Sequence, residues 1–93
     1  MRVLNKKLDV IPVGAVYIGR PSDWGNPFTH LGYGTARWRV STREQAVHAY
    51  GDWLRQQPLL VERARRELRG KDLVCWCSPL ACHGDVLMEV ANK

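Results

Sequence analysis

Residues 72–85 read DLVCWCSPLACHGD and carry the clearest structural signal in the chain. The first six of them form a nearly continuous apolar run, which is typical of a strand buried on both faces of a sheet. Ser78 and Pro79 follow as a helix N-cap and a favoured first-turn proline. We therefore expect a strand over residues 72–77 that leads directly into a helix over residues 79–91.

The sequence before this stretch alternates short apolar runs with amphipathic segments. Residues 15–18 are mostly β-branched or aromatic and predict a strand, and residues 3–4 predict a short edge strand. Ser41 is placed to start a capping box in which Glu44 reaches back to the serine. A helix is therefore expected over residues 42–56, because apolar side chains recur there at intervals of three and four.

A second helix is expected over residues 59–69, between a helix-ending Pro58 and Gly70. Strands interleaved with helices indicate the α/β class. We expect one small single domain, residues 1–93, with a short, mainly parallel sheet packed with about three helices. Residues 19–40 are rich in proline and glycine and predict a long loop, which in so small a domain is usually functional.

Composition narrows the class of protein. The 93 residues are 45% hydrophobic and 25% charged, which suits one globular domain with a modest core. No apolar run approaches the roughly 20 residues that span a bilayer, and residues 1–7 do not resemble a signal peptide. We therefore expect a cytoplasmic protein with no membrane partner, in which a disulfide framework is the weakest use of three cysteines.

All three cysteines fall within residues 75–82, and a histidine follows at once. Thiolates and imidazoles bind soft metals and act as nucleophiles and bases, so this cluster is the first candidate site. Three interpretations stay open: small core side chains, a zinc site, or a reactive thiol with the histidine as its base. The candidate zinc ligands are Cys75, Cys77, Cys82 and His83, and the candidate catalytic residues are Cys77, Cys82, His83 and Asp85.

The second candidate site lies in residues 20–28, which combine two prolines and two aromatic residues with four hydrogen-bonding side chains. Such a stiff loop can hold a phosphate, ribose or base, with an aromatic ring as stacking surface. The alternative is that its aromatic rings only cover the core. Because ligand crevices form at the carboxyl ends of strands, we expect this loop to face the cysteine cluster. The candidate ligand-binding residues are Arg20, Ser22, Asp23, Trp24 and Asn26.

The chain is basic. Its 14 Lys and Arg residues exceed the 9 Asp and Glu residues, which gives a formal net charge of +5. This excess favours phosphate-bearing small molecules or nucleic acid as partners. We expect the second of two basic clusters to be a solvated helix face, because no aromatic residue is interleaved with it. The clusters are Arg37, Arg39 and Arg43, and then Arg63, Arg65, Arg66, Arg69 and Lys71.

Two motifs cover most of the informative sequence: VYIGRPSDWGNPF at residues 16–28 and CWCSPLACHGDVL at residues 75–87. They resemble a family of small domains of unknown function whose signature is the Cys-Trp-Cys element. Members of that family look to be single domains in bacteria, bacteriophages and some other organisms. The resemblance therefore implies a bacterial or phage protein of the cytoplasm, and it implies no established activity.

Together the two candidate sites predict a domain that binds a nucleotide-like or phosphate-bearing ligand between residues 20–28 and residues 77–85. Two alternatives stay open: a zinc-stabilised basic module that binds nucleic acid, and a phage protein that interacts with a host protein. Both explain the charge but not the stiff loop. Neither an enzymatic reaction nor an oligomeric state follows from the sequence.

Overall fold

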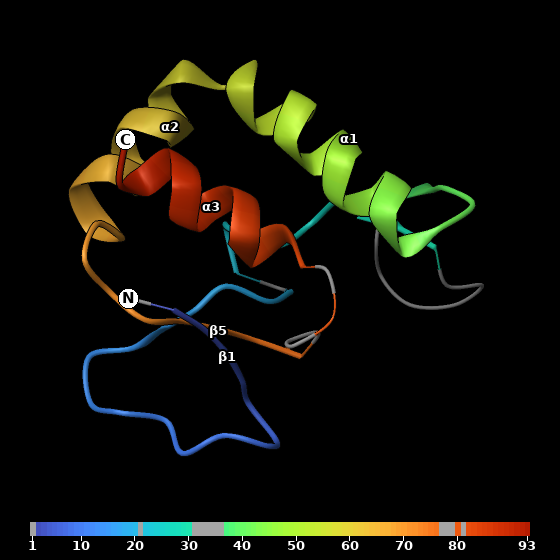
Figure 1. Cartoon of the computed structure of the whole chain (residues 1–93). Coiled ribbons are helices and arrows are strands. Elements are labelled where there is room, and N and C mark those ends of the chain that lie inside the picture. Colours follow the sequence, from blue (N-terminus) through green and yellow to red (C-terminus); the bar gives the residue numbers. More distant parts are fainter. Residues whose placement is uncertain (1, 21, 31–36, 77–79, 81) are drawn as a thin grey trace.

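The computed structural model describes residues 2–20, 22–30, 37–76, 80 and 82–93. Within these residues the chain forms five short strands and three helices (Figure 1). The strands are β1 (Val3–Asn5), β2 (Val16–Tyr17), β3 (Phe28–Thr29), β4 (Trp38–Arg39) and β5 (Leu73–Cys75). The helices are α1 (Arg43–Arg55), α2 (Pro58–Glu67) and α3 (His83–Ala91). The predicted α/β class, with a short parallel sheet and three helices, is confirmed.

Strand β5 is the centre of a three-stranded parallel sheet with the order β1-β5-β2. Leu73 pairs with Val3 on one side and with Val16 on the other. All three residues of β5 are buried, but the strand is shorter than the predicted 72–77, because Asp72 and the exposed Trp76 lie outside it and Cys77 is not among the described residues. Because the strands are parallel, the chain leaves β2 and β5 at the same edge of the sheet.

The N-cap of helix α1 is Thr42, one residue later than predicted. Thr42 is the N-cap, and its hydroxyl oxygen accepts a hydrogen bond from the Gln45 backbone N–H at 3.1 Å. The Gln45 side chain accepts in turn from the Ser41 N–H at 2.9 Å. The prediction that Ser41 and Glu44 form a capping box was wrong, because Thr42 is the N-cap and the Gln45 side chain binds the N–H of Ser41, the residue before the cap.

Helix α2 overlaps the predicted segment 59–69, but it begins at Pro58 and ends at Glu67. Pro58 occupies its first turn, where a missing N–H breaks no helical bond. Gly70 follows the helix with a φ of +75°, a left-handed conformation that glycine adopts without steric cost. Local rules therefore placed this helix but not its exact ends.

Helix α3 begins at His83, later than predicted. Cys82 is its N-cap, with an extended backbone at φ −143° and ψ 146°. The Cys82 sulfur accepts from the Gly84 N–H at 3.3 Å, and the Asp85 carboxylate accepts from the Cys82 N–H at 3.2 Å. The helix predicted over residues 79–91 was therefore wrong at its start, because these residues form a capping box of their own.

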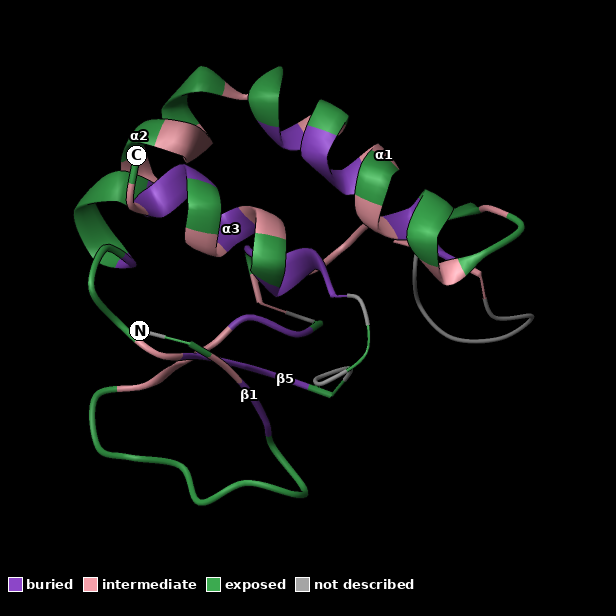
Figure 2. Ribbon diagram, viewed as in Figure 1, coloured by how far each residue is buried: buried purple, intermediate pink, exposed green. Residues whose placement is uncertain are grey.

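The three helices lie on the same side of β1 and β5 (Figure 1). Helix α3 contacts β1, β5 and both other helices, and Figure 2 shows that the helices turn their buried faces inward. No helix in the described part of the chain is long and apolar enough to cross a membrane. The largest fully buried side chains are Tyr50, Ile18, Leu54, Leu68, Leu73, Leu87, Cys75 and Cys82.

A second parallel sheet, formed by β3 and β4, lies within the segment that was predicted to be mostly loop. The Trp38 N–H donates to the Pro27 carbonyl at 2.8 Å, and the Val40 N–H donates to the Thr29 carbonyl at 2.7 Å. The rings of Phe28 and Trp38 stack with their centroids 5.1 Å apart. Sequence reasoning missed these strands because each has two residues, too few for an alternating pattern.

Gly84 allows α3 to approach the sheet closely. A β-carbon there would lie 2.9 Å from Ile18 Cδ1 and 3.0 Å from Val3 Cγ1.

We expect Gly84→Ala to lower the free energy of unfolding by about 1–3 kcal/mol, although alanine normally stabilises a helix relative to glycine. Urea unfolding measures this change. Glu89→Ala, an exposed position of the same helix, is the control and should change the free energy by less than about 0.5 kcal/mol. A Gly84→Ala protein more stable than the parent would contradict the close packing.

Candidate functional site

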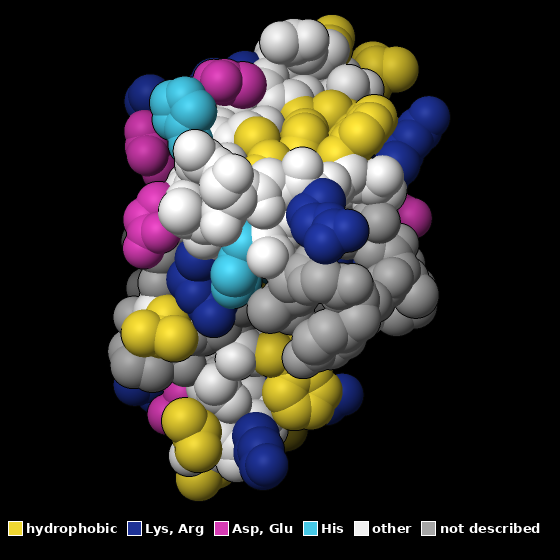
Figure 3. All heavy atoms as spheres, turned by 90° about the vertical axis from the view of Figure 1, so that its right-hand side faces the viewer, with side chains coloured by type: hydrophobic (Ala, Val, Ile, Leu, Met, Phe, Trp, Pro, Cys, Tyr) yellow, Lys and Arg dark blue, Asp and Glu magenta, His cyan; other side chains and the backbone are white. Residues whose placement is uncertain are grey.

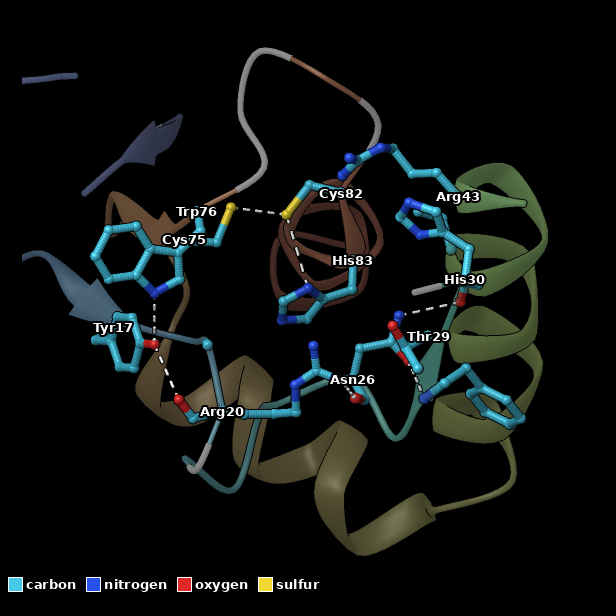
Figure 4. Close-up of a pocket in the computed structure, with 14 residues that line it drawn as sticks. Tyr17, Arg20, Asn26, Thr29, His30, Arg43, Cys75, Trp76, Cys82 and His83 are labelled. Carbon is cyan, nitrogen blue, oxygen red and sulfur yellow. Dashed lines mark hydrogen bonds between the residues drawn. The ribbon is translucent and has the colours of Figure 1, made fainter. Parts of the chain in front are cut away.

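A cavity of about 340 Å³ opens at the edge of the sheet where β2 and β5 end. Its walls come from both predicted site regions, from β3 and from the first turns of α1 and α3 (Figure 4). The structure thus brings together the loop after β2 and the corner between β5 and α3. The lining residues are Tyr17, Gly19, Arg20, Asn26, Phe28, Thr29, His30, Arg43, Ala46, Val47, Cys75, Trp76, Cys82 and His83.

Two of the three cysteines meet in this cavity. Cys75 is the last residue of β5, and Cys82 caps α3. Their sulfur atoms are 2.7 Å apart, and each residue is 1% exposed. Both are thiols and not a disulfide. Cys77, the third predicted member of the cluster, lies outside the described residues.

His83 is held in one orientation by its neighbours. Its Nε2 lies 2.8 Å from the carbonyl oxygen of Ile18, at the exit of β2. Because a carbonyl oxygen only accepts, Nε2 carries the ring proton, and in a neutral imidazole Nδ1 is then the acceptor. Nδ1 lies 3.7 Å from the Cys82 sulfur. The Cys82 thiol can therefore donate to His83, which is the arrangement of a thiol with an adjacent base.

Tyr50 covers one edge of this imidazole. The two rings meet edge to face with their centroids 5.0 Å apart, and the Tyr50 hydroxyl donates to the Trp24 carbonyl at 2.9 Å. Burial, with a smaller contribution from Cys82, raises the pKa of Tyr50. The phenol therefore stays neutral at physiological pH and does not compete with His83 for the thiol proton.

Arg20 and Asn26 bring the first predicted region to the cavity. The Arg20 Nη1 donates to the Asn26 carbonyl at 3.3 Å, a bond that does not use up the five N–H donors of a guanidinium. The Asn26 side chain donates to the Ala46 carbonyl at 3.1 Å and accepts from the Phe28 N–H at 2.9 Å. Asn26 thus fastens the loop to α1, while the Arg20 guanidinium reaches into the cavity.

Arg43 and His30 also line the cavity, although the sequence did not single them out as site residues. Arg43 is the first residue of α1, and Figure 4 shows Arg20 and Arg43 reaching into the cavity from opposite sides. Among the described lining residues none is acidic. The signal for Arg43 was its place at a helix N-terminus, but only the folded chain shows that this terminus adjoins the strand ends.

The surrounding surface has the same electrostatic character. Figure 3 shows Lys and Arg side chains beside a histidine near the middle of one face, with acidic side chains toward its margins. The N-termini of α1 and α3 both contribute lining residues, and a helix N-terminus carries a partial positive charge. The cavity is therefore suited to an anion.

Tyr17 and Trp76 form an aromatic rim beside the cavity. The Tyr17 hydroxyl accepts from the Trp76 indole N–H at 3.0 Å and donates to the Arg20 carbonyl at 3.0 Å. The Lys6 ammonium lies 4.8 Å from the Tyr17 ring centroid and 5.5 Å from that of Trp76. Trp76 is 54% exposed, so the rim presents an aromatic face to solvent in a fixed position.

Three residues of the predicted ligand loop do not line the cavity. Trp24 is 4% exposed, within the core, and the Arg63 guanidinium lies 4.9 Å from its ring centroid. Asp23 pairs with the same Arg63 at 2.9 Å. The Ser22 hydroxyl is buried without a hydrogen-bond partner among the described residues. Asp23 and Trp24 therefore attach this loop to α2 and the core.

Two predictions remain: Asp85 as a catalytic residue, and a zinc site formed by the cysteines and His83. Asp85 is exposed, accepts from the Cys82 N–H and does not line the cavity. Among the residues that the structure describes, no three His, Cys, Asp or Glu side chains are grouped to hold a metal ion. Cys77 is not among them, so the predicted set with Cys75, Cys82 and His83 stays a prediction.

Comparison with known proteins identifies a family and no activity. A model of the family described as "Domain of unknown function (DUF4326)" matches residues 1–93, which is the whole chain. The resemblance to a family of unknown function is thereby confirmed. No curated protein and no solved structure matches.

Asn26 is expected to stabilise the fold through its two hydrogen bonds. Asn26→Ala leaves the Ala46 carbonyl and the Phe28 N–H without this partner and should lower the free energy of unfolding by about 1–3 kcal/mol. Chemical denaturation measures the loss. His48→Ala, on an exposed face of α1, is the control and should cost less than about 0.5 kcal/mol. If the two variants unfold alike, Asn26 does not anchor the loop.

Proposed function

We propose that this chain, which belongs to the family described as a domain of unknown function (DUF4326), binds a nucleotide-like, phosphate-bearing ligand in the cavity. The observation that carries this proposal is the placement of Arg20 and Arg43 on opposite sides of one cavity (Figure 4), whose described walls hold no acidic side chain. Two guanidinium groups can each donate bidentate, charge-assisted hydrogen bonds to phosphate. The two adjoining helix N-termini favour the same charge.

The size and the aromatic walls of the cavity support a nucleotide over a bare phosphate. Its volume of about 340 Å³ is near the lower end of the roughly 300–1,000 Å³ typical of small-molecule sites, which suits one nucleotide rather than two. Phe28 lines the cavity and is held by stacking on Trp38. Trp76 is held by its indole hydrogen bond to Tyr17. Rings fixed in this way offer stacking surfaces for a base.

Cys82 and His83 are the chemically reactive pair beside such a ligand. The thiol can transfer its proton to Nδ1, and the Gly84 N–H at the start of α3 stabilises the resulting thiolate. Any covalent step on the bound ligand would begin at this sulfur. A reducing compartment such as the cytoplasm keeps the thiols available for it.

Titration calorimetry with AMP, GMP and inorganic phosphate tests the proposal. We expect a nucleoside monophosphate to bind with a Kd of about 1 mM or tighter and inorganic phosphate to bind more weakly. Arg20→Gln and Arg43→Gln should each weaken binding by about 10- to 150-fold, the loss of one charge-assisted contact. Arg65→Gln removes the same charge from an exposed position on α2 and should leave the affinity within about twofold.

The controls also separate the alternatives. Circular dichroism confirms that each variant is folded, and elemental analysis of the same samples reports zinc. Saturable AMP binding that is weakened about tenfold or more in both cavity variants and kept in Arg65→Gln supports the proposal. Absence of nucleotide binding at millimolar concentration, or oligonucleotide binding that depends on Arg65 and not on Arg20 and Arg43, contradicts it.

A further inference from the structure

The two described thiols are positioned for bond formation with each other. The sulfur atoms of Cys75 and Cys82 are 2.7 Å apart, and a disulfide bond of about 2.05 Å needs them to approach by only about 0.65 Å. Cys75 ends the central strand, and Cys82 caps the helix that packs on it. The fold, rather than a flexible segment, therefore holds the pair together.

The cavity gives a small oxidant access to this pair. Both residues are 1% exposed, yet both line the cavity of about 340 Å³. A hydrogen peroxide molecule can enter such a space, whereas an oxidising protein cannot reach the buried sulfurs. The site therefore selects a small oxidant.

The two thiols are not equivalent. The Cys82 sulfur accepts from the Gly84 N–H at 3.3 Å at the N-terminus of α3 and lies 3.7 Å from His83 Nδ1. Both contacts favour the thiolate, which is the nucleophilic form. Cys75 lies at the end of a buried strand. Cys82 is therefore the thiol that reacts first.

We propose that Cys75 and Cys82 are a peroxide-reactive redox pair. The Cys82 thiol gives its proton to His83, and the thiolate sulfur bonds to one peroxide oxygen as the O–O bond breaks. The departing hydroxide takes up that proton and leaves as water, so Cys82 is oxidised to a sulfenic acid and the peroxide is reduced. The Cys75 sulfur then bonds to the Cys82 sulfur, the S–O bond breaks, and the hydroxyl group leaves as water with the Cys75 proton.

The resulting disulfide changes the wall of the cavity. Its formation does not require a bound nucleotide. It joins the Cys82 sulfur to Cys75, and the sulfur no longer has a proton to give to His83. A small thiol reductant restores both thiols by exchange. Failure of nucleotide binding leaves this proposal standing, and failure of oxidation leaves nucleotide binding standing.

The experiment uses the full chain with Cys77→Ser, so that Cys75 and Cys82 are its only cysteines. One equivalent of hydrogen peroxide is added to the reduced protein, and thiol loss and intact mass are followed. We expect two thiols to disappear together, the mass to fall by two hydrogen atoms, and dithiothreitol to reverse both changes. The native chain is treated in parallel, and peptide mapping should assign its disulfide to Cys75 and Cys82.

Single-cysteine variants test the order of the steps. With Cys75→Ala added, Cys82 should form a sulfenic acid that dimedone traps. With Cys82→Ala added instead, Cys75 should react with peroxide at least roughly tenfold more slowly than Cys82 does in the first variant. His83→Gln keeps a side-chain amide that can donate to the Ile18 carbonyl but removes the base, and it should slow the oxidation of Cys82 by roughly tenfold or more.

Three outcomes would overturn the proposal. The first is a folded Cys77→Ser protein that forms no disulfide with peroxide, while the same chain unfolded in urea does. The second is equal reactivity of the two single-cysteine variants. The third is stoichiometric zinc in the purified protein that protects both thiols from peroxide.

Discussion

The hydrogen bond from His83 Nε2 to the Ile18 carbonyl joins the two halves of the site. It ties the first residue of α3 to the exit of β2, and the absence of a side chain at Gly84 lets the helix lie close enough for the bond to form. The same bond fixes the imidazole tautomer and leaves Nδ1 toward Cys82. The reactive thiol, the base and the loop that carries Arg20 are therefore positioned by one contact between helix and sheet.

The sequence was informative where structure depends on neighbouring residues. The buried strand β5 and the approximate position of α2, between Pro58 and Gly70, follow from local rules. The start of α3 does not. A serine and a proline offered a cap near residue 79, whereas the helix begins at His83, where the side chain gains a bond to Ile18 that lies 65 residues away in sequence. The later start combines the capping box of Cys82 and Asp85 with this tertiary contact, and the tertiary contact cannot be read from neighbouring residues.

The partners of the charged side chains also could not be predicted from neighbouring residues. The cluster at residues 63–71 was expected to be a solvated helix face, yet Arg63 pairs with Asp23 and Glu67 and covers the ring of Trp24. Arg69 donates to the carbonyl oxygens of two residues at the end of the chain, including Ala91. Part of the basic excess thus serves the fold. Arg20 and Arg43 instead both line one cavity, which composition alone could not reveal.

We propose that the strand ends and the start of α3 form one anion-binding cavity. A crystal structure of the reduced protein with AMP bound tests it most directly, because the position of the phosphate is observed and not inferred. We expect the phosphate to lie between the guanidinium groups of Arg20 and Arg43, with the base against Phe28 or Trp76. AMP bound on the basic face of α2, near Arg65, with only water in the cavity would contradict it.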